Sequence, residues 1–438
     1  MAAGKYMLKV FGCQMSFRDG ESLAGQLQQV GYLPTDDESK ADIIVFQTCC
    51  VRESAERKIY GRINQLKGLK NNKPALIIGV SGCLAQKDRE LVFKRCPHVD
   101  FVLGTHQLGK LPQVLTDLST FRHLILVDEA GQDFESMPAV RTQGVRAYVN
   151  ITYGCSNFCS YCIVPYVRGV ERSRELQDIV LETKAAIEEG YPEIMLLGQN
   201  VNTYGLDLNR KGTNFVSLLK TLDSMPNLKR IRYMTSHPRD FTKEMVETVK
   251  NARSICEHFH LPIQSGSNRI LSSMNRGYTR DHYLQLIDGI RVLIPGASIT
   301  TDLIVGFPGE TEADFADTLD LVERVQFDAA YTFMFSPRRG TKAATFNDQI
   351  PSKVKKERLK YLNTIQGRNS RMRNQLLIGQ DVEVLVEGVS KNNAEMLAGR
   401  TRTNKLVHFK GSKQLSGELV TVSIKGAYTW TLHGRLVS

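Results

Sequence analysis

The 438-residue chain is 42% hydrophobic, and it carries 57 Lys and Arg residues against 46 Asp and Glu residues. This composition excludes disordered and fibrous proteins, and the length exceeds one ordinary hydrophobic core, so we expect two or three globular domains. The sequence has no secretory signal pattern and no apolar run of membrane length, which favours a cytoplasmic protein without a membrane partner. Nine cysteines in a reducing compartment favour metal ligation or catalysis over disulfide bonds.

The first part of the chain alternates short apolar runs with helical patterns such as the one from Arg52 to Lys70. This alternation predicts a parallel α/β domain, which we place at residues 1–130. The less regular stretch from Ser119 to Gln143 looks like a linker. The candidate strands are Tyr6 to Phe11, Ala41 to Phe46, Ala75 to Val80 and Val99 to Leu103.

Strand and helix patterns alternate again over residues 141–375, and six such units predict a partial (β/α)6 barrel. Each candidate strand ends in a polar or glycine-containing cluster, so the six clusters should line one mouth, where parallel α/β folds bind their ligands. The candidate strands are Ala147 to Thr152, Glu193 to Leu197, Arg230 to Met234, His258 to Ile263, Ser298 to Val305 and Ala329 to Phe335.

The C-terminal part of the chain is strongly basic. From Arg338 to the end, 19 Lys and Arg residues face 7 Asp and Glu residues, a net charge of +12, whereas the preceding part carries −1. A basic helix from Lys353 to Arg373 leads into alternating segments at residues 376–438, which predict a small antiparallel β-barrel. An excess of this size on a short module indicates a polyanionic partner.

Three cysteines lie within eight residues directly after a candidate strand, as Cys155, Cys159 and Cys162. A loop with this spacing can supply three thiolates to a 4Fe-4S cluster and leave the fourth iron open. An open iron is what a radical enzyme needs, because the amino and carboxylate groups of S-adenosylmethionine (SAM) must chelate it. The alternative, a zinc loop, would normally bring a fourth Cys or His nearby, and none lies between Ile163 and Tyr191.

A second set of cysteines, Cys13, Cys49 and Cys83, follows three successive strands of the first domain. One such cysteine alone would more often be a small core residue. Three at the carboxyl ends of parallel strands should converge, which favours a shared metal. Neighbouring residues that leave a strand point to opposite sides, so we expect Cys49, rather than the adjacent Cys50, to be the ligand. Structural roles are expected for Cys50, Cys96 and Cys256.

Several segments are specific enough to suggest a family. They are GCSNFCSYCIVPYVRGVERSR, LLGQNVNTYG, LPIQSGSNRIL, TDLIVGFPGET and GRTRTNKLVHF. Together they resemble the radical SAM methylthiotransferases, most closely the tRNA-modifying MiaB-type members. The resemblance covers essentially the whole chain and implies an N-terminal methylthiotransferase domain, a radical SAM domain and a C-terminal TRAM domain. One departure is Gln47 before Thr48 and Cys49, where the family usually has Asn.

The resemblance implies two 4Fe-4S clusters, an auxiliary one on Cys13, Cys49 and Cys83 and a radical-generating one on the second trio. It also implies the reaction, which adds a 2-methylthio group to N6-isopentenyladenosine beside the tRNA anticodon. One SAM would supply the 5′-deoxyadenosyl radical that activates the unreactive C2–H, and a second SAM would methylate the sulfur delivered at the auxiliary cluster. The implied partners are isopentenylated tRNA, an electron donor such as flavodoxin or ferredoxin, and a sulfur source.

The same resemblance assigns contacts to SAM and to RNA. Tyr161 would contact the SAM adenine, or else be a core aromatic, and the glycine and polar positions at the strand ends could instead be turns or helix caps. His237 precedes a proline, so it could position a loop or act in catalysis. By resemblance the SAM contacts are Tyr161, Gly198, Gln199, Asn200, Asp302, Gly306 and Glu310. Ser236, Gln264 and Arg276 are added as SAM contacts because they line the same predicted mouth. The RNA contacts in the TRAM-like segment are Arg400, Arg402, Lys405 and Phe409, and the alternative, a solvated charged face, is disfavoured by the net charge of +12.

Other functions remain open at this point. A related methylthiotransferase acts on an aspartate of a ribosomal protein, and another uses threonylcarbamoyladenosine in tRNA. The cysteine-motif context and the basic C-terminal segment favour RNA. A non-catalytic, metal-stabilised RNA-binding protein is the alternative outside the enzymes, and it would be a colourless zinc protein rather than a brown iron-sulfur protein.

Overall fold

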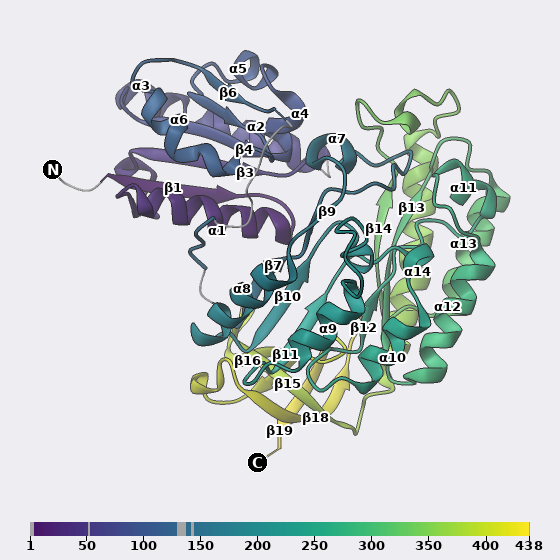
Figure 1. Cartoon of the computed structure of the whole chain (residues 1–438). Helices are drawn as coiled ribbons and strands as arrows, with labels where there is room; N and C mark the ends of the chain where they lie inside the picture. The colour runs from purple at the N-terminus through teal and green to yellow at the C-terminus, as the bar shows by residue number, and fades with distance from the viewer. Residues whose placement is uncertain (1–3, 51–52, 129–136, 142–143, 438) are drawn as a thin grey trace. The chain divides into compact units, whose positions relative to one another are not determined.

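The computed structural model describes residues 4–50, 53–128, 137–141 and 144–437, and the side chains of residues 53–55 are not described. The chain forms two compact units (Figure 1). The first comprises Met1–Gln143 together with Tyr153–Ser156 and Ile163–Glu171. The second comprises Gly144–Thr152, Asn157–Cys162 and Arg172–Ser438. Two short segments around the Cys155 to Cys162 motif therefore fold with the first unit, which the sequence pattern did not indicate.

The first unit contains a parallel sheet of six strands in the order β2-β1-β3-β4-β5-β6, which confirms the expected parallel α/β fold. Apolar side chains on the two faces of the sheet form two separate hydrophobic clusters beneath the helices. The strands are β1 Lys5–Val10, β2 Leu33–Pro34, β3 Ile43–Thr48, β4 Ile77–Gly82, β5 Phe101–Leu103 and β6 Leu124–Leu126. The helices are α1 Gln14–Gln29, α2 Glu53–Gln65, α3 Lys67–Asn72, α4 Cys83–Asp88, α5 Leu91–Arg95, α6 Leu111–Asp117 and α7 Val164–Arg168.

Two details of the first unit differ from the expectation. Strand β6 lies within the stretch Ser119 to Gln143 that looked like a linker, because three residues pairing at a sheet edge leave too short an apolar pattern to stand out. The helix expected from Arg52 is two helices, α2 and α3, separated by Leu66, whose amide bonds to the Ile63 carbonyl in a tight turn. Arg52 and Gln143 themselves lie outside the described residues.

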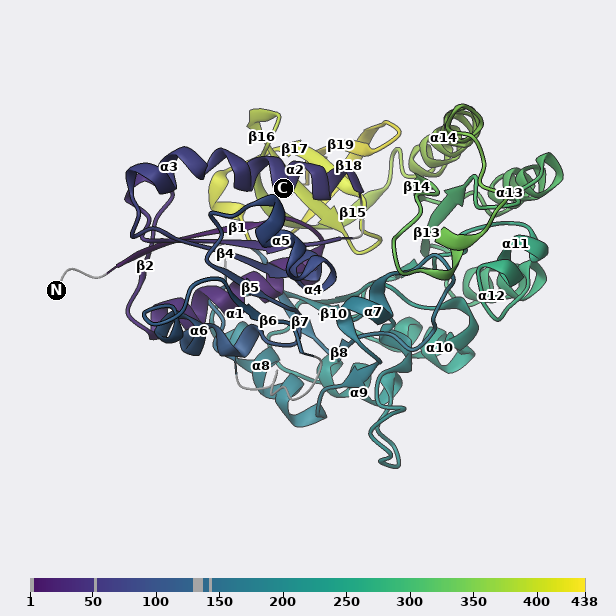
Figure 2. The same cartoon turned by 90° about the horizontal axis from the view of Figure 1, so that it is seen from above.

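The second unit contains six parallel strands in two three-stranded sheets, β11-β10-β7 and β12-β13-β14. A parallel bridge between Ile231 and Ile255 links them, so the expected partial barrel is confirmed. Figure 2 shows α12 and α13 outside β13, and one large apolar cluster fills the space between strands and helices. The strands are β7 Arg146–Asn150, β10 Glu193–Leu197, β11 Arg230–Tyr233, β12 His258–His260, β13 Ser298–Val305 and β14 Ala329–Met334, with short β8 Thr152–Tyr153 and β9 Arg172–Ser173. The helices are α8 Leu176–Glu188, α9 Phe215–Asp223, α10 Lys243–Asn251, α11 Asn268–Ser273, α12 Arg280–Leu293, α13 Glu312–Val325 and α14 Ser352–Gln375.

The last strands form a small closed barrel in the order β15-β16-β17-β19-β18. Four neighbouring pairs are antiparallel, but β17 and β19 are parallel, which corrects the expectation of a purely antiparallel barrel. The reason is that β18 and β19 form a hairpin, so the second arm of this hairpin closes the barrel beside β17 and in the same direction. The strands are β15 Asp381–Ser390, β16 Asn393–Thr401, β17 Leu406–Lys410, β18 Leu419–Ala427 and β19 Thr431–Leu436.

The small barrel packs against the amino ends of strands in the second unit. Arg230 and Arg232, at the start of β11, are both buried. Arg230 donates to the Arg400 carbonyl over 2.6 Å, and Arg232 donates to the Thr401 carbonyl over 2.6 Å. The polar clusters that follow the strands lie at the opposite, carboxyl ends. In the part of the chain that the structure describes, no helix is long and apolar enough to cross a membrane.

Candidate metal centres and cofactor site

In the first unit, three cysteines lie at the carboxyl ends of adjacent strands. Cys13 follows β1 and directly precedes α1, Cys49 follows β3, and Cys83 follows β4 as the first residue of α4. The three strands are neighbours in the sheet, so their carboxyl ends share one edge. A hydrogen bond from Cys49 and the charge of Arg168 lower the pKa of Cys13 to about 5, and thiolates are the form that binds iron.

A buried arginine lies beside these cysteines. Arg168, the last residue of α7, donates to the Cys83 sulfur over 3.3 Å and to an Asp19 carboxylate oxygen over 2.6 Å. Gln47 donates to the same oxygen of Asp19 over 3.1 Å, so the residue that departs from the family pattern orients the carboxylate. The sequence reasoning missed this network. Its only signal was one cation in the short, otherwise uncharged helix Val164–Arg168.

Cys50, expected to be structural, is also close to this group. It is buried in an apolar cluster with Cys83, Ile163 and Val167. A hydrogen bond with Cys83 and burial raise the pKa of Cys50 well above its ordinary value, so it stays a neutral thiol. Cys49 hydrogen-bonds to Cys13, another member of the trio. Cys50, which is outside the trio, hydrogen-bonds to its third member, Cys83. Cys96 is buried in the core behind the sheet.

The second motif is divided between the two units. In the first, the Cys155 amide donates to the Gly169 carbonyl over 3.1 Å. The preceding Gly154 has a φ of +72°, and a Cβ there would lie 2.1 Å from the Val170 carbonyl oxygen, so only glycine fits. In the second, the Cys162 amide donates to the Cys159 carbonyl over 2.9 Å in a turn.

Arg276 lies beside Cys159 and Tyr161 in the second unit. Its guanidinium is buried, contacts the Cys159 sulfur at 3.4 Å and the Tyr161 hydroxyl at 3.5 Å, and donates to the Pro262 carbonyl over 2.7 Å. Burial raises the pKa of Tyr161, so the phenol stays neutral. The structure thus brings together two predicted SAM contacts and one predicted cluster ligand.

Polar residues after β10 and β11 form a second hydrogen-bonded group. Asn200 is buried, accepts a hydrogen bond from the His237 amide over 3.0 Å and donates to Asp240 over 3.3 Å. Gly198 precedes it, and a Cβ there would lie 2.2 Å from the Thr152 hydroxyl. Gln199, between them, is half-buried.

Two side-chain atoms of this group lack a partner. Among the described residues, the buried Ser236 hydroxyl and the His237 Nε2 atom make no hydrogen bond. Buried polar atoms are normally paired, so these two fit a site that takes a polar ligand such as SAM.

The residues around β13 that were predicted to contact SAM differ in their interactions. Gln264 has a φ of +74°, and its backbone bridges to Asp302 and Ile304. Asp302 lies on β13, 3.6 Å from His260. Glu310 is buried and accepts from the Gly306 amide over 2.7 Å and from Arg358 over 2.6 Å. This carboxylate therefore holds the turn after β13 against α14.

The charges beside the two groups of cysteines suit iron-sulfur clusters. Thiolate-bound clusters are anionic, and the buried guanidiniums of Arg168 and Arg276 beside the two thiol groups match that charge.

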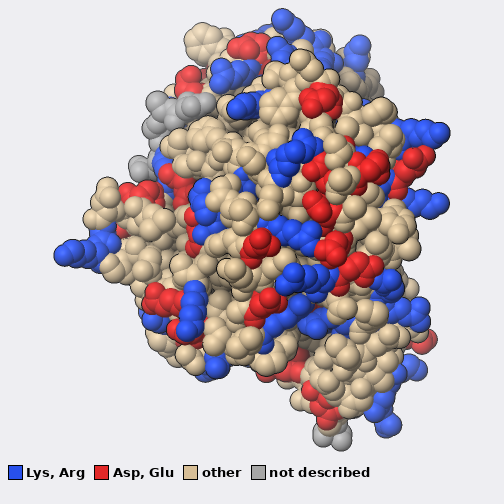
Figure 3. All heavy atoms as spheres, turned by 90° about the vertical axis from the view of Figure 1, so that its right-hand side faces the viewer, with Lys and Arg blue, Asp and Glu red and all other residues tan. Residues whose placement is uncertain are grey.

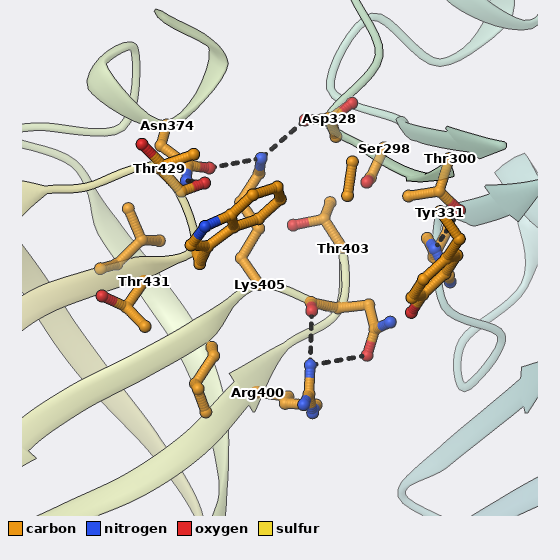
Figure 4. A pocket seen from close by; sticks show the side chains of 16 residues that line it. Ser298, Thr300, Asp328, Tyr331, Asn374, Arg400, Thr403, Lys405, Thr429 and Thr431 are labelled. Atoms are coloured by element: carbon orange, nitrogen blue, oxygen red, sulfur yellow. Dashed lines mark hydrogen bonds and ion pairs between the residues drawn. The ribbon is translucent and has the colours of Figure 1, made fainter. Parts of the chain in front are cut away.

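The three basic residues expected to contact RNA also make intramolecular contacts. Lys405 donates to Asp328 over 2.6 Å and to Asn374 over 2.8 Å, as Figure 4 shows. Arg400 donates to the Asn404 carbonyl over 3.0 Å, and Arg402 pairs with Glu257 at 2.7 Å. The contacts of Lys405 and Arg402 join the barrel to the amino ends of β14 and β12.

Phe409, the aromatic residue expected to contact RNA, is fully buried in the core of the small barrel. Its burial follows the alternation of β17, in which Val407 and Phe409 point inward. This period of two in the sequence predicts that Phe409 is a core residue. Figure 3 shows basic and acidic side chains interspersed over the face it displays, so the net charge is not gathered there as one patch.

Comparison with known proteins defines the class. Residues 149–322 match the Radical SAM superfamily, residues 375–437 the TRAM domain, and residues 5–104 the uncharacterized protein family UPF0004. The fold is similar to that of the radical S-adenosylmethionine methyltransferase TsrM from Kitasatospora setae, with a TM-score of 0.57 and 14% identity over 78% of this chain and 77% of that chain. The chain is a radical SAM protein, a class that uses SAM and a 4Fe-4S cluster.

Full-length relatives define the family. The chain is 52% identical to the tRNA-2-methylthio-N(6)-dimethylallyladenosine synthase of Moorella thermoacetica, over 99% of this chain and 98% of that protein. It is 48% identical to the protein of the same name from Carboxydothermus hydrogenoformans, over the whole of both. The chain belongs to this methylthiotransferase family, and the resemblance inferred from the sequence is confirmed.

Proposed function

We propose that the chain adds a methylthio group to C2 of N6-isopentenyladenosine beside the tRNA anticodon. The observation that carries the proposal is the placement of Cys13, Cys49 and Cys83 at one edge of a parallel sheet. They lie in a chain that also has the Cys155 to Cys162 motif and is 52% identical to a named tRNA methylthiotransferase. A radical SAM protein with a second thiol trio is suited to insert sulfur.

The two cysteine trios would hold two 4Fe-4S clusters. When bound, the clusters and SAM would supply a radical that activates the adenine carbon, together with the sulfur and the methyl group that are added to it. Acid-base chemistry cannot activate this carbon. Arg276 keeps a buried positive charge beside Cys159, and Ser236 and His237 offer unpaired polar atoms to the SAM head group. An external electron donor, such as a flavodoxin or ferredoxin, and a sulfur source would complete the system.

Anaerobic reconstitution tests the proposal directly. The chain should bind about eight irons, as two 4Fe-4S clusters require. With SAM and a reductant it should increase the mass of isopentenylated tRNA by one methylthio group, and it should leave tRNA without the isopentenyl group unchanged. Modification of threonylcarbamoyladenosine or of a ribosomal-protein aspartate instead would reject this substrate. A colourless zinc protein would reject the enzyme class.

A further inference from the structure

A hollow lies between the small barrel and the amino ends of β12, β13 and β14, all within the second unit. Its volume is about 160 Å³, and Tyr331, Arg400, Lys405, Trp430 and Ser298 are among its lining residues. We call it the Trp430 pocket. Figure 4 shows Tyr331 across the hollow from Thr429 and Thr431, the two neighbours of Trp430 in the chain. Two aromatic residues from different elements, Tyr331 and Trp430, therefore line the hollow.

Both aromatic residues are solvent-exposed. Trp430 is the only tryptophan of the chain, and it is 64% exposed, while Tyr331 is 51% exposed. Leaving so large an apolar ring in water forgoes the stabilisation that burial would give. Packing of the small barrel therefore does not explain why an indole stands at this position.

The turn that carries Trp430 is held in place before any ligand arrives. Asn374 on α14 donates to the Tyr428 carbonyl over 2.8 Å and to the Thr429 carbonyl over 3.2 Å. Lys405 in turn donates to the Asn374 side chain. A fixed aromatic surface costs less conformational entropy on binding than a mobile one.

The charges around the pocket are positive overall. Among its lining residues, Arg400 and Lys405 are cations and Asp328 is the one carboxylate, so the lining carries one surplus positive charge. An exposed aromatic ring beside surplus positive charge is the combination that binds unpaired nucleotides.

The pocket also lies at a distance from the candidate SAM site that a large substrate can span. Ser298, at the start of β13, lines the pocket, and Gly306 directly follows the end of the same strand. Eight residues of strand separate the two by about 25 Å. A folded RNA can reach both places, whereas a mononucleotide cannot.

We propose that the Trp430 pocket binds an unpaired nucleobase of the tRNA, stacked on the indole of Trp430, as a contact distinct from the modified base. The inference rests on the proposed function, which supplies the tRNA. In this proposal Trp430, rather than the buried Phe409, is the aromatic residue of the C-terminal barrel that contacts RNA.

The single tryptophan makes the test specific to this site. The reconstituted full-length chain is titrated anaerobically with isopentenylated tRNA, and tryptophan emission is followed beside a gel-shift measurement of Kd. Emission should change and saturate together with binding. Trp430→Ala should raise Kd about 5-fold to 100-fold, and Trp430→Phe should restore most of the affinity. The slope of log Kd against log salt should stay the same, because no cation is removed.

Phe121→Ala serves as the control, since Phe121 is 58% exposed and belongs to the first unit. Unchanged emission at saturating tRNA, or equal Kd values for Trp430→Ala and Phe121→Ala, would overturn the pocket while leaving the proposed function intact. Failure of the wild-type chain to bind tRNA would overturn both. Thermal unfolding of Trp430→Ala should match the wild type, because the side chain is mostly exposed.

Discussion

The guanidinium of Arg168 lies 2.6 Å from the carboxylate of Asp19, and both side chains are buried. Arg168 follows the Cys155 to Cys162 motif by six residues, yet it folds with the first unit and also contacts Cys83. A buried ion pair needs its geometry satisfied to avoid a large desolvation cost. The same guanidinium contacts Cys83, a ligand of the proposed auxiliary cluster, so Arg168 is placed to stabilise that cluster's negative charge.

Replacing Arg168 should therefore loosen the auxiliary cluster. We expect Arg168→Met to release its iron to a chelator about 10-fold to 100-fold faster than wild type, as for other residues that support metal ligands. Arg168→Lys should be intermediate, because it keeps the charge but loses the planar fork. The measurement uses a chain with Cys155, Cys159 and Cys162 replaced by Ala, so that only the auxiliary cluster absorbs.

The same variants give a second readout. Removing a buried positive charge should shift the reduction potential of the auxiliary cluster to more negative values, because the reduced cluster carries one more negative charge. Arg57→Met, at an exposed position of α2, is the matched control and should change neither quantity. Equal potentials in Arg168→Met and Arg57→Met would show that Arg168 is only structural.

Cys155→Ala should abolish SAM cleavage and leave the auxiliary cluster in place. The two sets of cysteines are separated in the sequence, and the Cys13, Cys49 and Cys83 trio belongs entirely to the first unit. Iron content should fall by about half, from two clusters to one. Anaerobic iron analysis and the yield of 5′-deoxyadenosine check this. Loss of both clusters from a folded chain would contradict two independent sites.

Cys49→Ala should lose the auxiliary cluster, whereas Cys50→Ala should retain most of it. The Cys49 thiol hydrogen-bonds to Cys13, which is the thiol with the lowered pKa. Cys50 hydrogen-bonds to Cys83 within an apolar cluster and remains a neutral thiol. A neutral, apolar-packed thiol is a poor iron ligand. The two variants are reconstituted without oxygen and compared for iron content and tRNA methylthiolation. Equal losses, or a loss confined to Cys50→Ala, would reverse the assignment.

The candidate cluster ligands could be placed from the sequence because strand order determines where strand ends meet. Cys13, Cys49 and Cys83 each follow a short apolar strand, and parallel strands bring their carboxyl ends to one edge. The roles of Arg402 and Lys405 could not be foreseen in this way. Their partners, Glu257 and Asp328, lie 145 and 77 residues away along the chain, and no local pattern encodes such pairings.

Acid should destabilise the chain partly through His237. Burial, Arg276 and Arg239 lower its pKa in the folded chain to about 2, compared with about 6.5 when unfolded. Below pH 6.5 the unfolded chain therefore binds one more proton than the folded chain, and the free energy of unfolding falls by up to about 1.4 kcal/mol per pH unit.

His237→Gln should remove this component of the pH dependence. Between pH 7.5 and 5.5, denaturant unfolding should show a loss smaller by about 1 kcal/mol than in the wild type. His123→Gln, at an exposed position, is the control and should follow the wild type. The measurement is made without SAM, which would bind beside the imidazole. Parallel curves for His237→Gln and wild type would contradict a buried neutral histidine.

Arg402 should matter for stability more than for RNA binding. Its guanidinium pairs with Glu257 at 2.7 Å and donates to the Ile255 carbonyl over 2.5 Å, so it links the small barrel to the segment before β12. Hydrogen bonds to charged groups contribute about 1.5–3 kcal/mol each when buried, and partial exposure reduces that. We expect Arg402→Met to lower the free energy of unfolding by about 1–3 kcal/mol.

A phosphate contact would behave differently. If Arg402 neutralised a phosphate, its loss would reduce the salt slope of tRNA binding by about one. We expect an unchanged slope in Arg402→Met, because the charge is already matched by Glu257. Lys410→Met is the control, since Lys410 lies on β17 of the same barrel and is exposed. Unchanged stability together with a reduced salt slope of tRNA binding would show that Arg402 contacts RNA.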